Sequence, residues 1–158
     1  MSIIKHGTAH WEGSLKEGHG VISTQSGALK EQPYGFKTRF EGKPGSNPEE
    51  LLGAVYAACF SMALSAILGE AGLTAQAIDT DAAVQLTKAD SGFEIGQIDL
   101  TLKARVPGAT NEQFQALAIK AKDCLLYPSD AADEEARVDL RGRRHLKKQT
   151  QTILCYTH

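Results

Sequence analysis

The feature that most constrains this chain is a long apolar segment at residues 47–69, which reads NPEELLGAVYAACFSMALSAILG. Its first residues are typical of a helix start, because Ser46 or Asn47 can cap free backbone N–H groups and Pro48 suits the first helical position. The acidic side chain of Glu49 favours the positive end of the helix dipole. The following positions are apolar on nearly every side, so the sequence predicts a buried helix that other structure encloses.

Length and composition predict one compact domain without a strong charge field. The chain has 158 residues, of which 42% are hydrophobic, enough for a sizeable core. A net charge of −2 favours neither nucleic acid nor an anionic membrane as partner. The apolar run at 54–68 is about 15 residues, below the roughly 20 that span a bilayer, and residues 1–13 lack the pattern of a signal peptide. We therefore expect a cytoplasmic protein.

The residues before this helix have the sequence pattern of short strands. Residues 6–29 contain β-like pieces separated by glycines, which predicts a hairpin or meander. Residues 34–40 alternate, which predicts a further strand with Phe36 and Phe40 on one face. In such a strand Arg39 points away from that face.

The residues after the helix predict a hairpin and a second helix. Strands are expected at 81–88 and 98–106, with one face apolar and the other polar. Because the apolar residues before and after Gly96 have opposite parity, a bulge is expected there. A capping box that starts at Thr110 predicts a second helix at 111–122. The expected order of elements is therefore a β-meander, a buried helix, a β-hairpin and a second helix.

The last segment, residues 124–158, has no sustained helical or strand period. It contains a cluster of basic residues between 141 and 148, which can be interpreted as a nucleic-acid patch. We favour a disordered or non-native tail over that interpretation. The domain is accordingly expected to comprise residues 1–123.

Cys59, in the middle of the apolar helix, is the first candidate for chemistry. A buried cysteine is often a packing residue only, and that alternative stays open. A nearby guanidinium such as Arg39 could stabilise the thiolate, which is the nucleophilic form. Glu49 could hold this arginine in a bidentate pair. On one straight helix Glu49 and Cys59 lie about 15 Å apart, so they can cooperate only through Arg39 or through a second chain.

The histidines and glycines predict neither a metal site nor a phosphate loop. The five histidines show no metal-ligand spacing, and no Cys-x-x-Cys occurs. The glycines near position 42 lack the Lys-Ser/Thr context of a nucleotide-binding loop. We predict no cofactor.

Several long, collinear stretches resemble one family. These stretches are AHWEG (9–13), QPYGFKTRFEG (32–42), NPEELLGAVYAACFSMALS (47–65), GEAGL (69–73) and the strand pair that ends at Val106-Pro107-Gly108. Through them the sequence resembles the osmotically inducible protein C branch of the OsmC/Ohr family up to about residue 122. The resemblance implies an α+β fold, with an antiparallel sheet around a long buried central helix plus a second helix. It also implies an intertwined homodimer in which the central helices of both chains pack between the sheets.

The resemblance also implies a thiol-dependent peroxidase that reduces organic hydroperoxides and, less efficiently, hydrogen peroxide. Cys59 matches the peroxidatic cysteine, Arg39 the activating arginine, and Glu49 the carboxylate that orients it. In the family the resulting sulfenic acid condenses with a second cysteine, and a lipoyl-type dithiol reduces the disulfide. An apolar lining that includes Phe36 and Tyr56, together with the adjacent Phe60, would suit alkyl or lipid hydroperoxides.

The tail departs from the family pattern. Cys124 lies near the position of the second cysteine, but one residue early and without the expected Cys-Pro. The family's final strand has no evident counterpart, and residues 124–158 resemble non-native read-through sequence. Reduced stability and impaired turnover are therefore expected. Two other functions stay open: a thiol redox sensor or a non-enzymatic binding domain on the same fold.

Overall fold

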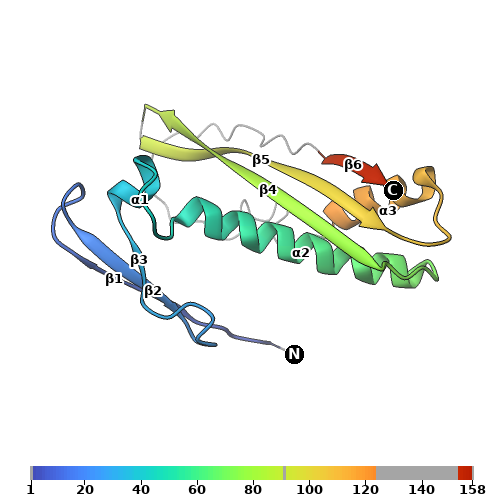
Figure 1. Cartoon of the computed structure of the whole chain (residues 1–158), viewed down its shortest axis with the longest axis horizontal. Coiled ribbons are helices and arrows are strands. Elements are labelled where there is room, and N and C mark those ends of the chain that lie inside the picture. The colour runs from blue at the N-terminus through green and yellow to red at the C-terminus, as the bar shows by residue number, and fades with distance from the viewer. Residues whose placement is uncertain (1, 91, 124–152, 158) are drawn as a thin grey trace, which may run out of the picture. The chain divides into compact units, whose positions relative to one another are not determined.

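The computed structural model describes residues 2–90, 92–123 and 153–157. The chain divides into two compact units, Met1–Leu51 and Leu52–His158. Each unit contains a three-stranded sheet, and the long helix α2 begins in the first unit and continues through the second (Figure 1).

The first unit is a β-meander followed by a short helix. Strands β1 (Gly7–Glu12), β2 (His19–Thr24) and β3 (Gln32–Tyr34) pair antiparallel in that order. Helix α1 (Phe36–Phe40) follows β3 directly. The expectation of a hairpin or meander at residues 6–29 is thereby confirmed, since β1 and β2 form a hairpin there and β3 extends it to a meander.

The strand expected at residues 34–40 is wrong, because β3 ends at Tyr34 and α1 follows it. The two phenylalanines of this segment are four residues apart, a spacing that puts them on one side of a strand and also on one side of a helix. In α1 the rings of Phe36 and Phe40 pack with their centroids 4.8 Å apart. Arg39 does not point away from this pair, since its Cζ lies 5.1 Å from the centroid of the Phe40 ring.

The long apolar segment forms helix α2 (Pro48–Glu70), close to the predicted range. The side chain of Asn47 caps it, because Oδ1 accepts a hydrogen bond from the backbone N–H of Glu50 at 2.8 Å. Gly72 follows the last turn with φ 72°, a left-handed conformation that glycine adopts without a steric penalty. Ordinary capping signals thus define both ends of this helix.

The second unit contains a long antiparallel hairpin of β4 (Ala77–Ala89) and β5 (Gly92–Arg105). The pairing register shifts between Gln85 and Leu86. Gly96 of β5 consequently has no opposite residue on β4, as in a β-bulge. The bulge predicted near this glycine is confirmed.

A second helix and a last strand complete the second unit. Helix α3 (Asn111–Asp123) starts where predicted, and Thr110 Oγ1 accepts a hydrogen bond from Gln113 N–H at 3.2 Å. Strand β6 (Ile153–Thr157) pairs parallel with β5. The expectation of an irregular tail without a strand is wrong for these residues, because their backbone pairs with residues 100–104 of β5. The other residues of 124–158, and the basic cluster among them, lie outside the described residues.

Helix α2 packs one face against the sheet of the second unit (Figure 1). Phe60, Leu64 and Leu68 have no exposed surface, whereas Val55 is 55% and Met62 75% exposed. The core consists of residues from α2, β5 and α3: Phe60, Leu64, Ile67, Leu68, Leu100, Leu102, Ala104, Phe114, Ala118 and Ala121. Among the residues that the structure describes, α2 is therefore not enclosed on all sides, although the sequence predicts that it is.

The apolar segment was expected to be too short to cross a membrane, and this expectation is wrong. Helix α2 has 23 residues and is, by length and composition, long and apolar enough to do so. Phe60, Leu64 and Leu68 are buried in a core with β5 and α3, so one face of α2 packs as the face of a core helix does.

Two glycines of α2 should respond oppositely to alanine. A Cβ atom on Gly53 would lie 2.8 Å from the carbonyl oxygen of Ala82, whereas one on Gly69 would meet no atom within 4 Å. Gly53→Ala is expected to lower the free energy of unfolding by about 1–2 kcal/mol through overpacking. Gly69→Ala should raise it by about 0.5–1 kcal/mol through helix propensity. Denaturant unfolding of both variants checks this, and a stabilised Gly53→Ala would contradict the close packing of α2 on β4.

Candidate active site

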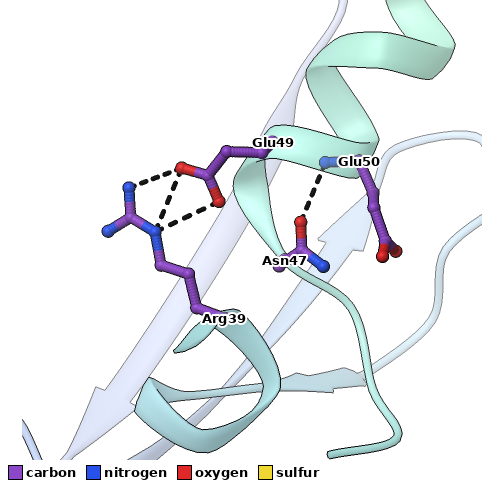
Figure 2. Close-up of polar contacts among 4 residues, drawn as sticks. All are labelled: Arg39, Asn47, Glu49 and Glu50. Atoms are coloured by element: carbon purple, nitrogen blue, oxygen red, sulfur yellow. Dashed lines mark hydrogen bonds and ion pairs between the residues drawn. The ribbon is translucent and has the colours of Figure 1, made fainter. Parts of the chain in front are cut away.

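A bidentate ion pair joins α1 to the first turn of α2. Arg39 Nε donates to both carboxylate oxygens of Glu49, at 3.0 Å to Oε1 and 3.1 Å to Oε2. Arg39 Nη2 also donates to Oε1, as Figure 2 shows. The bidentate pair predicted for Glu49 and Arg39 is thus present.

The local fold explains the position of each partner. Glu49 lies in the first turn of α2, which the Asn47 cap defines, so its carboxylate also lies at the positive end of the helix dipole (Figure 2). Arg39 is in α1, where the Phe40 ring lies against its guanidinium. The side chains of Arg39 and Glu49 are 32% and 14% exposed. This partial burial and the fork geometry favour a stronger pair than a fully exposed one.

Cys59 is a free thiol in α2, within the second unit. It is half-buried and packs against the hydrophobic core of that unit. Ten residues separate it from Glu49 on the same helix, which corresponds to about 15 Å along the axis. The half-buried position leaves part of the residue accessible, as a reactive thiol requires.

The predicted lining residues differ in exposure. Phe36 and Tyr56 are half-buried, and Tyr56 packs against the core of the second unit. Phe60 is completely buried within that core. The predicted second cysteine, Cys124, lies outside the described residues.

The sequence did not indicate two residues that contact the ion-pair segments. The Phe40 ring lies beside the Arg39 guanidinium, and the Thr38 hydroxyl bonds to backbone groups of both segments. The adjacency of Thr38 and Phe40 to Arg39 in the sequence was the available signal. It was misleading because a strand would direct neighbouring side chains to opposite faces.

Histidines gather elsewhere in the first unit, on the β1–β2 hairpin. Glu12 bonds to His10 Nε2 at 3.1 Å and lies 3.7 Å from His19 Nε2. The hydrogen bond from His10, and then the charges of both imidazoles, lower the pKa of Glu12. Across the described ranges, the structure contains no group of three or more His, Cys, Asp or Glu side chains that could hold a metal ion.

Comparison with solved structures identifies the fold class. The crystal structure of the organic hydroperoxide resistance protein OhrB of Bacillus subtilis matches with a TM-score of 0.60 and 23% identity, covering 97% of this chain and 98% of that one. An OsmC-like protein from Mycoplasma pneumoniae matches with a TM-score of 0.67 and 11% identity, covering 99% of both chains. The fold is therefore the α+β fold of OsmC-like proteins.

Sequence comparison identifies the family. The model of the OsmC family, described as OsmC-like protein, matches residues 40–129. The chain is 57% identical to peroxiredoxin OsmC of Escherichia coli (strain K12) over 122 residues, 77% of this chain and 85% of the relative. It is 30% identical to organic hydroperoxide resistance protein OhrB of Bacillus subtilis (strain 168) over 109 residues, 68% of this chain and 78% of the relative. This chain belongs to the OsmC/Ohr family.

Proposed function

We propose that this protein is a thiol-dependent peroxidase that reduces organic hydroperoxides, and hydrogen peroxide less efficiently, to alcohols or water. The observation that carries the proposal is the bidentate Arg39–Glu49 pair, in a chain whose α2 helix also presents the half-buried thiol of Cys59. Relatives named peroxiredoxin and organic hydroperoxide resistance protein support the same activity.

The proposed reaction begins with the Cys59 thiolate. Its sulfur attacks the distal oxygen of the hydroperoxide, so that an S–O bond forms and the O–O bond breaks. The alkoxide leaves with a proton as the alcohol, and Cys59 becomes a sulfenic acid. The Arg39 guanidinium stabilises the attacking thiolate, and Glu49 orients the guanidinium.

A second thiol completes the cycle. Its attack on the sulfenic sulfur releases water and forms a disulfide, which an external lipoyl-type dithiol reduces with two electrons. Cys124 is the proposed second thiol. No cofactor takes part in this scheme.

Three apolar side chains, those of Phe36, Tyr56 and Phe60, are the proposed lining for alkyl or lipid hydroperoxides. Phe36 and Tyr56 are half-buried, so part of each ring remains available to a substrate. Phe60 has no exposed surface and would support the site from the core. We propose that these side chains favour an apolar alkyl group over a polar one.

The uncovered face of α2 supports a homodimer. Val55 and Met62 are largely exposed on a helix with few polar side chains, and a second copy would bury them. A site that includes residues from both chains would agree with the separation of Glu49 and Cys59 along α2. We propose that the homodimer is cytoplasmic. We also propose that residues 1–123 form the body of its domain and that residues 124–158 are non-native in sequence, although 153–157 add strand β6 to the sheet.

Multiple turnover tests the proposed activity. Purified protein is given excess cumene hydroperoxide and dihydrolipoamide, and the alcohol produced is counted per thiol. Several equivalents of alcohol per thiol are expected, formed at a rate that the altered tail lowers. A redox sensor would instead give one equivalent, from a single stoichiometric oxidation. Turnover as fast as that of a chain carrying the family's usual C-terminal segment would contradict the proposal that the tail impairs function.

A further inference from the structure

One hydroxyl group joins the two backbone segments that carry the ion pair. Thr38 Oγ1 accepts a hydrogen bond from Gly35 N–H at 2.9 Å and lies 2.9 Å from the carbonyl oxygens of both Gly35 and Ser46. Since a threonine hydroxyl has one proton, it donates to one of these carbonyls at a time. Gly35 O also accepts from Arg39 N–H at 3.2 Å. This carbonyl has a second lone pair, so the distances fit either acceptor, and we assign the Thr38 proton to Ser46 O.

These hydrogen bonds connect the backbone next to Arg39 with the backbone shortly before Glu49. Thr38 directly precedes Arg39 in α1, and Ser46 lies three residues before Glu49, next to the cap of α2. Ser46 is itself anchored to Pro33, whose carbonyl accepts from Ser46 N–H at 2.9 Å and from Ser46 Oγ at 3.0 Å. The half-buried Thr38 side chain thus connects the start of α1 to the segment before α2.

Close packing reinforces the connection. Gly45 has φ 148°, and a Cβ atom there would lie 2.5 Å from Thr38 Cγ2 and 3.1 Å from Pro33 O. The chain before α2 therefore passes directly against the Thr38 methyl group, in a conformation that favours glycine. Both the hydroxyl and the methyl of Thr38 define how α1 sits against this segment.

We infer that Thr38 is a positioning residue for the Arg39–Glu49 pair. Two parallel N–H···O bonds require the guanidinium and the carboxylate to be coplanar and correctly spaced, so the spacing of their backbones matters. The hydrogen bond between the Thr38 hydroxyl and the Ser46 carbonyl holds the two backbone segments at this spacing. The inference rests on the proposed function, in which the pair orients Arg39 toward thiolate chemistry.

The test compares Thr38→Val, which keeps the shape but removes the hydroxyl, with Thr38→Ser, which keeps the hydroxyl. In Thr38→Val the solvent exchange of the Arg39 Nε–H proton, measured by NMR, should accelerate. The value of kcat/KM for cumene hydroperoxide should fall about tenfold, as expected for the loss of one positioning hydrogen bond. Thr38→Ser should restore both values to within about twofold of the wild type.

Thr24→Val is the matched control. Thr24 is also half-buried in the first unit, and its hydroxyl bonds to Leu29 N–H at 3.0 Å and Leu29 O at 3.4 Å. Its loss should lower stability comparably while leaving the Arg39 exchange rate and kcat/KM unchanged. If Thr38→Val does not fold, Thr38→Ala takes its place.

Wild-type exchange and activity in the hydroxyl-free Thr38 variant would overturn the inference, as would a Thr38→Ser variant as impaired as Thr38→Val. An equal effect of Thr24→Val would also overturn it, because the effect would then be general destabilisation. If the wild-type protein shows no turnover, the proposed function fails instead. The NMR comparison still decides whether Thr38 positions Arg39.

Discussion

Replacing Cys59 with serine is expected to abolish hydroperoxide reduction, lowering kcat/KM by at least about a thousandfold. The substitution exchanges sulfur for oxygen at one atom, and a serine hydroxyl is not ionised near neutral pH, so no comparable nucleophile remains. The measurement is the initial rate of cumene hydroperoxide loss with a dithiol in excess.

Folding of this variant should be nearly unchanged. Cys59 is half-buried rather than enclosed, so a slightly smaller and more polar atom at this position should cost less than about 1 kcal/mol. Thermal unfolding therefore separates loss of chemistry from loss of structure. Retention of more than a tenth of the wild-type rate in a folded Cys59→Ser protein would show that another group reacts with the peroxide.

Replacing Arg39 with methionine should lower kcat/KM about a hundredfold, since an electrostatic partner of the reacting group is lost. Methionine keeps an unbranched apolar side chain that can still contact the Phe40 ring, while the positive charge disappears. The initial rate of cumene hydroperoxide reduction with a dithiol in excess checks this effect.

Lys37→Met provides a matched control on the same helix. Lys37 is exposed and lies 3.7 Å from the exposed carboxylate of Glu17, so its charge should contribute little. Its rate should resemble that of the wild type. Equal losses in Arg39→Met and Lys37→Met would attribute the effect to the general charge of α1 and contradict a specific role for the Arg39–Glu49 pair.

The sequence predicted those elements that local patterns define. Helix α2 was predictable because Asn47 and Pro48 mark its start and because its apolar run is long. The bulge at Gly96 was predictable because a change of parity along a strand leaves few other solutions. In both cases the information lies within a few neighbouring residues.

The sequence-based predictions were wrong where one residue pattern fits both a strand and a helix. They were also wrong where an element depends on a pairing partner far away in the chain. Phe36 and Phe40 fit a strand face and a helical turn equally well, so the sequence could not separate β3 from α1. Strand β6 depends on pairing with β5, about fifty residues earlier, for which five residues give little signal. The apolar character of α2 predicts burial, but it does not show which chain covers each face.

In the candidate site, too, some contacts were predictable from the sequence and others were not. The pairing of Glu49 with Arg39 was predictable because opposite charges flank a helix start. The role of Thr38 was not, because it depends on the backbone of Ser46 lying within hydrogen-bond distance of its hydroxyl. Such a contact between a side chain and a distant carbonyl leaves no pattern in the sequence.

Trapping the first intermediate tests the central claim most directly. The reduced protein is mixed with one equivalent of cumene hydroperoxide and a 1,3-diketone that captures sulfenic acids, and the adduct is located by peptide mass spectrometry. The account predicts one adduct on Cys59, with one equivalent of cumyl alcohol released and no adduct in Cys59→Ser. An adduct confined to another cysteine, with Cys59 still a thiol after the alcohol has formed, would contradict it.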